Sequence, residues 1–265
     1  MNEVLISLVL GFIQAIAEFL PISSSGHLIL AKAFFNFDSS FFNLSFDIIL
    51  HLGSLVALII FFRKDLLKIS GSFLVKSGDR RLGYSILLAI IPAIILGLLL
   101  DGSIEDKLRQ VPVVLVMLFI VGILFIVAEN ISKKKKDISG ISLKDAFIIG
   151  IAQSLALVPG VSRSGITITS GLFLGFKRDE AARFSFLLSI PTILLAFIKD
   201  IYELWKVNIS SIFSMPYFVG FLISAVTSFL VIKFLINYLK NNTLKPFAYY
   251  RFTLVILFLV ISYVF

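Results

Sequence analysis

Two segments of this 265-residue chain place chemically active side chains inside long apolar sequence. The first spans residues 11–26 and reads GFIQAIAEFLPISSSG. It contains Glu18, whose ionised carboxylate would cost roughly 2.5 to 3.5 kcal/mol at the centre of a bilayer, so it needs a partner, a metal ion or a catalytic task. Gln14 lies one helical turn before Glu18, and Ser24 and His27 also share a helix face. The segment therefore offers a carboxylate, an amide, a hydroxyl and an imidazole.

The second segment spans residues 150–165, reads GIAQSLALVPGVSRSG and supplies a positive charge. Arg163 is the only cation in either segment, and its planar guanidinium suits two phosphate oxygens. Both segments break at a proline, and the N–H groups and serine hydroxyls at the following helix start form an anion site, for which phosphate is the natural ligand. Together the segments contain a nucleophile, a base or metal ligand, an acid and a phosphate clamp, which is the equipment for phosphoryl transfer.

Structural explanations stand beside this chemical one. A serine cluster after proline is most often a helix cap, Arg163 and Glu18 can form an ion pair that merely neutralises both, and a single histidine such as His27 is more often a core residue. Asp47 and His51, four positions apart in the next apolar run, are interpreted as structural. The chemical interpretation is favoured because the only intramembrane glutamate, the only intramembrane arginine and a histidine fall in these two segments.

The two segments are copies of one motif and align without a gap at an offset of 139 positions. In this register Ser24 is opposed by Arg163. Each copy begins a similar series of apolar runs, so the chain divides near the lysine cluster 133–136 into two repeats, residues 1–132 and 140–265, within one membrane domain. An odd number of crossings per repeat inverts the second repeat relative to the first. The other aligned pairs are Gln14 with Gln153, Ser23 with Ser162, Ser25 with Ser164 and Gly26 with Gly165.

Composition excludes a soluble or a disordered protein, because 58% of the residues are hydrophobic and only 15% are charged. The net charge of +8 is assigned to anionic lipid rather than nucleic acid, since the basic residues fill short gaps between apolar runs. The absence of cysteine excludes disulfides and thiolate metal sites, and two histidines alone do not make a zinc site. The expected fold is an all-α polytopic membrane protein with six spanning helices, at residues 44–62, 82–100, 111–128, 181–198, 216–235 and 249–265.

Loop charges indicate how the two motif segments enter the membrane. If both return to the side they came from, as re-entrant hairpins, one side of the membrane carries seventeen Lys and Arg residues and the other five; if each crosses once, the counts are thirteen and nine. The positive-inside rule favours the hairpins, with both termini outside and the basic segments 133–144 and 240–251 in the cytoplasm. Irregular backbone inside a membrane must be buried or line a wet cavity, so the hairpins are predicted to meet at the centre.

The two motifs resemble the signatures of the undecaprenyl-diphosphate phosphatase family, also called the bacitracin-resistance BacA family. The resemblance covers essentially the whole chain and rests on Gln14 with EFLPISSSGH at residues 18–27, on PGVSRSG at residues 159–165 and on FSFLLSIP at residues 184–191. It implies a multi-pass enzyme of the bacterial inner membrane that removes the terminal phosphate of undecaprenyl diphosphate. The product would be undecaprenyl phosphate, the lipid carrier for peptidoglycan and other wall polymers.

The resemblance also implies roles for individual residues. Ser24 becomes the nucleophile, with Glu18 as base or metal ligand, His27 as catalytic histidine and Arg163 as the phosphate-binding residue. Attack by water, with Ser24 only binding phosphate, is the alternative. The expected substrate-binding residues are Gln14, Ser23, Ser25, Gly26, Ser162, Ser164, Gly165 and Thr167.

A divalent cation, Mg²⁺ or Ca²⁺, is the cofactor that the resemblance implies, with Glu18 and Gln14 as ligands. Many family members have a second glutamate where this chain has Gln14, so one negative charge is missing, although the amide oxygen can still coordinate a cation. The expected partners are undecaprenyl diphosphate and membrane lipids, with no nucleic acid. The oligomeric state is left open between a monomer and a homodimer.

Two other classes of protein share parts of this pattern. Inverted repeats with broken helices are also typical of secondary transporters and lipid flippases. An ion channel is disfavoured, because Glu18, His27 and Arg163 would form a pocket of mixed charge rather than a ring of one sign. Release of phosphate from a prenyl diphosphate would separate the enzyme from the transporter, because transport alone produces none.

Overall fold

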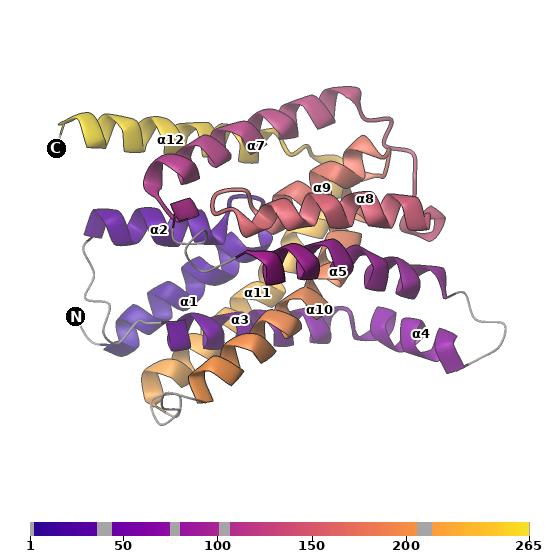
Figure 1. Cartoon of the computed structure of the whole chain (residues 1–265), viewed down its shortest axis with the longest axis horizontal. Helices are drawn as coiled ribbons and strands as arrows, with labels where there is room; N and C mark the ends of the chain where they lie inside the picture. Colours follow the sequence, from indigo (N-terminus) through magenta and orange to yellow (C-terminus); the bar gives the residue numbers. More distant parts are fainter. Residues whose placement is uncertain (1–2, 36–43, 75–79, 101–106, 206–213, 265) are drawn as a thin grey trace.

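The computed structural model of this chain is built from helices (Figure 1), as the apolar runs predict. Helices satisfy their backbone N–H and C=O groups internally, which a lipid environment demands. The described part of the chain contains no β-strand, and its one isolated bridge pairs Lys136 with Phe176. The all-α prediction is therefore confirmed. The structure describes residues 3–35, 44–74, 80–100, 107–205 and 214–264.

Each of the six predicted apolar runs forms a helix. The bounds are α3 Leu44–Phe61, α5 Arg81–Leu99, α7 Val111–Ile131, α10 Arg178–Trp205, α11 Met215–Asn241 and α12 Lys245–Val264. Of these, α5, α7, α10 and α11 are long and apolar enough to cross a membrane. A fifth span arises if α3 is counted together with α4 (Arg63–Leu74), to which it is bent by 71°. The described residues thus show four or five candidate spans rather than an established six.

The two motif segments form hairpins of two helices each. In Figure 1 the first hairpin opens toward the left of the view and the second toward the right, and their turns lie near the middle. Each breaks beside a proline, Pro21 or Pro159, because proline removes a backbone donor and disfavours a helical residue before it. The first hairpin consists of α1 (Glu3–Phe19) and α2 (Ser24–Phe35). The second consists of α8 (Leu143–Ser154), the 3₁₀ turn η2 (Leu155–Leu157) and α9 (Arg163–Phe173), and follows the 3₁₀ turn η1 (Ile138–Gly140).

Close helix packing holds the hairpins within the bundle. α1 packs against α3 and α11, α8 packs against α5, and α9 packs against α7 and α10. Glycines allow the closest approaches: a Cβ atom at Gly11 would lie 2.8 Å from the carbonyl oxygen of Gly220, and one at Gly150 would lie 2.5 Å from that of Ala89. Small residues at such contacts are typical of helix packing in membranes, because they let two backbones come together.

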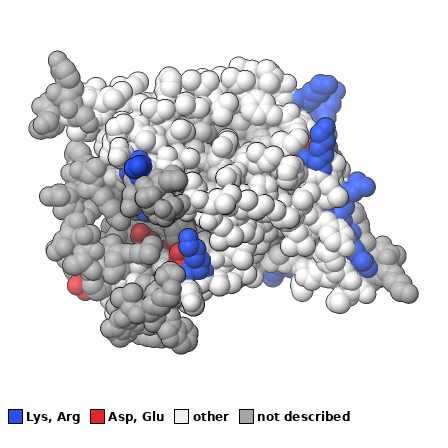
Figure 2. Space-filling view, in the orientation of Figure 1, with Lys and Arg blue, Asp and Glu red and all other residues white. Residues whose placement is uncertain are grey.

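The surface carries an uncharged belt between charged ends. Figure 2 shows most of the visible Lys and Arg at the end where α4 lies in Figure 1. The start of α1 and the end of α12 both lie at the opposite end. Exposed apolar side chains recur every four residues along α11, which makes an apolar stripe on the outside of that helix, at Phe218, Leu222, Val226, Leu230 and Phe234. The chain is therefore a multi-pass membrane protein.

Candidate active site

The turns of the two hairpins share one backbone feature, a serine with a positive φ angle just before the second helix. Ser23 and Ser162, which are equivalent in the repeat, have φ angles of 78° and 71°, a region uncommon for residues other than glycine. Each serine caps the helix that follows: Ser23 Oγ accepts a hydrogen bond from Gly26 N–H at 3.2 Å, and Ser162 Oγ accepts one from Gly165 N–H at 3.2 Å. These contacts satisfy N–H groups that a helix start otherwise leaves unpaired. The cap explanation is thus confirmed for these serines.

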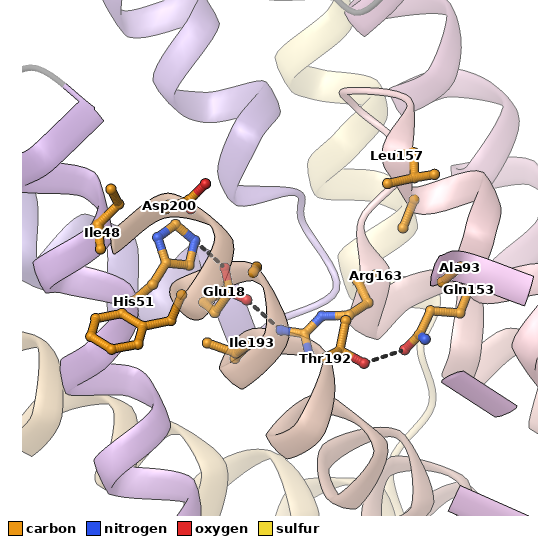
Figure 3. Close-up of a pocket in the computed structure, with 13 residues that line it drawn as sticks. Glu18, Ile48, His51, Ala93, Gln153, Leu157, Arg163, Thr192, Ile193 and Asp200 are labelled. Carbon is orange, nitrogen blue, oxygen red and sulfur yellow. Dashed lines mark hydrogen bonds and ion pairs between the residues drawn. The ribbon is translucent and has the colours of Figure 1, made fainter. Parts of the chain in front are cut away.

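The carboxylate of Glu18 joins the two hairpins (Figure 3). Its Oε1 forms an ion pair with Arg163 Nη2. Its Oε2 accepts hydrogen bonds from Ser24 Oγ at 3.0 Å and from Gln14 Nε2 at 3.2 Å. Only 8% of the Glu18 side chain is exposed, and such burial strengthens each of these contacts. Ser24 and Arg163, which come from different hairpins, therefore converge on one carboxylate.

His51 belongs to the same cluster, although the sequence interpretation treated it as structural. His51 Nε2 lies 3.0 Å from Gln14 Nε2 and 3.6 Å from Glu18 Oε2. His51 Nδ1 lies 2.8 Å from the carbonyl oxygen of Asp47, which can only accept, so Nδ1 carries a proton and Nε2 is the ring nitrogen that faces Gln14 and Glu18. The signal for this residue in the sequence was a polar pair four positions apart in an apolar helix.

A cavity of about 240 Å³ opens beside this cluster (Figure 3). Its polar lining consists of Glu18, His51, Gln153, Arg163, Thr192 and Asp200. The rest is alanine, leucine, isoleucine and phenylalanine from α3, α5, η2 and α10. The volume is below the roughly 300 to 1,000 Å³ of sites for drug-sized ligands, so the cavity suits a headgroup rather than a whole lipid.

Two buried donors at this cavity lack a hydrogen-bond partner among the described residues. They are Arg163 Nη1 and Gln153 Nε2. A buried polar group without a partner costs about 1 to 3 kcal/mol. In Figure 3 Arg163 lies between Glu18 and Gln153, and the Gln153 oxygen is oriented toward Thr192, whose hydroxyl lies 3.4 Å away. The cavity therefore favours a ligand rich in hydrogen-bond acceptors.

Known proteins resemble this chain over nearly its whole length. The family model described as bacitracin resistance protein BacA matches residues 7–257. The chain belongs to the BacA family. It is 44% identical over 262 residues to the undecaprenyl-diphosphatase of Rubrobacter xylanophilus, which covers 96% of each chain. It is 42% identical over 260 residues to the undecaprenyl-diphosphatase of Thermodesulfovibrio yellowstonii, which covers 98% of each.

In this BacA family member the predicted nucleophile, Ser24, is not among the residues that line the cavity and is linked to that lining through its hydrogen bond to Glu18. The predicted catalytic histidine, His27, also lies outside the lining. Its Nδ1 lies 2.7 Å from the carbonyl oxygen of Ser23 and donates to it, which leaves Nε2 to accept a hydrogen bond from the Tyr250 hydroxyl at 2.7 Å. The two rings stack with their centroids 5.6 Å apart. His27 thus fixes the start of α2 beside Ser24, and its catalytic role stays a prediction.

Other predicted binding residues hold the hairpins together. Ser164 Oγ donates to the Leu20 carbonyl at 3.3 Å, a contact between the two hairpins. Thr167 Oγ1 lies 2.6 Å from Ser185 Oγ and so ties α9 to α10. Ser25 is exposed. None of these residues lines the cavity, and their part in substrate binding stays a prediction.

Arg251 requires a correction to the loop-charge count. The count placed it in a cytoplasmic basic segment, but it lies within α12 and is fully buried. Arg163 is therefore not the only arginine inside the bundle. A guanidinium can be buried when its donors are hydrogen-bonded, and backbone carbonyls perform this function for Arg251. Sequence alone does not reveal such acceptors, because they come from segments distant in the chain.

A divalent cation fits this site when it shares its ligands with a substrate. Among the described residues, no group of three or more His, Asp or Glu side chains is placed to hold a metal ion. Gln14 Oε1, however, is a buried acceptor without a partner in the described part of the chain, and Glu18 provides carboxylate oxygens. Mg²⁺ and Ca²⁺ prefer such oxygen ligands, and Mg²⁺ commonly takes the rest from substrate phosphates.

Proposed function

We propose that this chain hydrolyses undecaprenyl diphosphate to undecaprenyl phosphate and inorganic phosphate, and so recycles the lipid carrier of cell-wall synthesis. The observation that carries this proposal is the Glu18 carboxylate, which contacts both the Ser24 hydroxyl and the Arg163 guanidinium. A nucleophile, its base and a phosphate-binding cation at one point are what phosphoryl transfer requires. The printed name of the relatives, undecaprenyl-diphosphatase, supports this substrate.

The diphosphate occupies the polar part of the cavity, and the prenyl chain extends from the cavity opening into the lipid. Phosphate oxygens accept hydrogen bonds from the two unpaired donors, Arg163 Nη1 and Gln153 Nε2. The limited volume of the cavity supports this arrangement, because it holds a headgroup and leaves the chain outside.

Ser24 attacks the terminal phosphorus of the bound diphosphate. The Oγ–P bond forms as the bond from that phosphorus to the bridging oxygen breaks, undecaprenyl phosphate leaves, and the Ser24 proton passes to Glu18 Oε2. Water then cleaves the phosphoserine, which releases phosphate and restores the hydroxyl. Direct attack by water, with Ser24 only binding phosphate, is the alternative mechanism.

Two histidines are candidates for the acid–base steps. The geometry favours His51, because its Nε2 faces Gln14 and Glu18 at the cavity and is the ring nitrogen that can exchange a proton there. The family resemblance names His27, whose two ring nitrogens contact Ser23 and Tyr250. Both assignments are tested by the pH dependence of the reaction.

We also assign the expected Mg²⁺ or Ca²⁺ to Gln14 Oε1, Glu18 and the substrate oxygens. When bound, the cation neutralises charge on the diphosphate. Gln14 orients this site, because its amide nitrogen contacts both Glu18 and His51 while its oxygen is left available. Chelation of divalent cations is expected to abolish phosphate release, and added Mg²⁺ or Ca²⁺ to restore it.

In the membrane we propose six spans and two re-entrant hairpins, arranged as inverted repeats at residues 1–132 and 140–265. The Lys- and Arg-rich end in Figure 2 faces the cytoplasm, and both termini face outward across the bacterial inner membrane. The opposite openings of the two hairpins in Figure 1 support the inverted arrangement. The mass of the purified protein decides between a monomer and a homodimer.

The direct test is phosphate release from a prenyl diphosphate by detergent-purified protein. The wild-type chain is expected to release phosphate, whereas Arg163→Ala raises KM and lowers kcat together, because it removes both a substrate contact and the partner of Glu18. A flippase or transporter, the rival function, would bind the lipid and release no phosphate. If the wild-type protein released no phosphate from the prenyl diphosphate when Mg²⁺ or Ca²⁺ was supplied, the result would contradict the proposal.

A further inference from the structure

One guanidinium contacts three separate segments of the chain. Arg251 Nη1 donates to the Pro21 carbonyl at 3.2 Å, Nη2 donates to the Gly160 carbonyl at 2.6 Å, and Nε donates to the Leu118 carbonyl at 3.0 Å. Nη2 also has longer contacts of 3.3 and 3.4 Å with two neighbouring carbonyls. All the acceptors are backbone oxygens. The hydrogen bonds of Arg251 therefore depend on where the backbone lies and not on the side chains of the acceptor residues.

Two of these carbonyls belong to the turns that carry the proposed chemistry. Pro21 lies in the first turn, between Glu18 and Ser24. Gly160 lies in the second turn, three positions before Arg163. The third carbonyl belongs to α7, which packs against α2 and α9, the helices that follow the two turns. Arg251 therefore connects the first hairpin, which carries Ser24, to the second hairpin, which carries Arg163, and both of them to α7.

The burial of this cation is costly, which argues against an incidental contact. Arg251 is fully buried, and no carboxylate among the described residues forms an ion pair with it. Its guanidinium lies 5.3 Å from the ring centroid of Phe125. Because no carboxylate in the described part of the chain pairs with the Arg251 guanidinium, its hydrogen bonds and the Phe125 ring must offset the free energy lost when the guanidinium leaves water. The second turn is also pressed against α7, since a Cβ atom at Gly160, where φ is +95°, would lie 2.6 Å from the Val114 carbonyl oxygen.

We propose that Arg251 is a positioning residue for hydrolysis, which fixes the two turns relative to each other so that Ser24 and Arg163 reach the same phosphate. The expected effect of Arg251 on kcat rests on the proposed function, but its effect on the relative position of the two hairpins does not. The role requires the planar fork of arginine, because the single ammonium of a lysine keeps the charge but does not reach carbonyls on three segments at once. Arg251→Lys is therefore the informative substitution.

The kinetic test compares Arg251→Lys with Tyr249→Phe, a change at an exposed position of the same helix. Arg251→Lys is expected to lower kcat by about 100-fold, the effect of displacing a reacting group by about 1 Å, with KM little changed. Tyr249→Phe should retain wild-type kinetics. All rates are measured below the unfolding temperature of each variant. A fall in unfolding temperature with an unchanged kcat would show a structural role alone and overturn the proposal.

A distance measurement tests the geometry without any substrate. The chain contains no cysteine, so Phe12→Cys in α1 and Ile151→Cys in α8, both about half exposed, take two spin labels selectively. A narrow distribution of label distances is expected with Arg251, and a broader or shifted one with Arg251→Lys. The same distribution in both proteins overturns the proposal. If the wild-type chain released no phosphate, the proposed function would fail while this measurement still decided whether Arg251 fixes the hairpins.

Discussion

Glu18 and Arg163 lie 145 positions apart in the chain and form an ion pair between the turns of two hairpins. Because Arg163 contacts one carboxylate oxygen, the other oxygen is left to accept the Ser24 hydroxyl at 3.0 Å. The structural and the catalytic explanations of this ion pair are therefore compatible. The same contact neutralises a buried charge and orients the base toward the nucleophile.

Ser24→Ala is expected to lower kcat by at least about 100-fold, because it removes the hydroxyl that Glu18 activates. Ser25→Ala serves as the comparison and should cause a smaller loss, because Ser25 is exposed and its hydroxyl lies 3.5 Å from Ser23 Oγ rather than on Glu18. Release of phosphate from a prenyl diphosphate measures both. Nearly intact turnover in Ser24→Ala would instead support direct attack by water.

The two histidines are expected to differ in the pH dependence of kcat. His51→Asn should remove one limb of the pH–rate profile, because the variant lacks the titrating ring nitrogen at the Glu18 cluster. His27→Asn should lower kcat but keep the shape of the profile, since His27 acts on the start of α2 through Ser23 and Tyr250. The opposite result, a limb lost only in His27→Asn, would confirm the role implied by the family resemblance.

Gln153→Glu should weaken the binding of phosphate groups. The substitution replaces an unpaired donor at the cavity with a carboxylate that repels an anion. KM for the prenyl diphosphate and the inhibition constant of inorganic phosphate are both expected to rise about tenfold, which corresponds to about 1.4 kcal/mol. Asn130→Asp, at an exposed position, adds the same charge away from the cavity and should change neither constant. Unaltered inhibition by phosphate in Gln153→Glu would exclude this donor from the site.

Asp145, at the start of α8, should make stability depend on pH. Burial alone would raise the pKa of this carboxyl, but hydrogen bonds from Lys136 and Ser142 hold the pKa below its ordinary value. A lowered pKa in the folded state means that the stabilisation is present above the pKa of the unfolded carboxyl and is lost as pH falls through the folded-state pKa.

Asp145→Asn is therefore expected to reduce the free energy of unfolding by about 1 kcal/mol at neutral pH, as for the loss of a helix cap. The difference from wild type should shrink as the medium becomes acidic. Asp137→Asn is the control, because its ion pair with Lys177 is exposed and such pairs contribute little. Thermal unfolding across a pH series measures all three proteins, and a difference that stays constant with pH would contradict the assignment.

The helices and the meeting of the hairpins were predictable because lipid imposes strong rules on sequence. A charged residue such as Glu18 in an apolar stretch must find a partner, and the broken backbone near Pro21 and Pro159 must be buried in protein. The alignment of the two motifs places Ser24 opposite Arg163, which predicts that the two residues meet. These inferences depend on local sequence and on the membrane alone.

The rest depended on which faces of distant helices pack together. His51 reaches Glu18 because α3 packs beside α1, and Arg251 is buried because α12 packs on α7. The periodicity of a single helix does not predict either packing. The sequence therefore suggested a structural role for His51, which lines the cavity, and a loop position for Arg251, which is buried. The serine hydroxyls were ambiguous for another reason, since capping and phosphate binding use the same groups.

The equivalence of Ser24 and Arg163 limits how such a protein can arise from duplicated halves. Two identical halves paired antiparallel would present either two hydroxyls or two cations where the turns meet, and neither combination provides both an attacking group and a clamp. Under the proposed mechanism the copies must therefore differ where Ser24 faces Arg163, just as they differ where Glu18 faces Leu157. Joining them in a single polypeptide ensures that each molecule receives one of each.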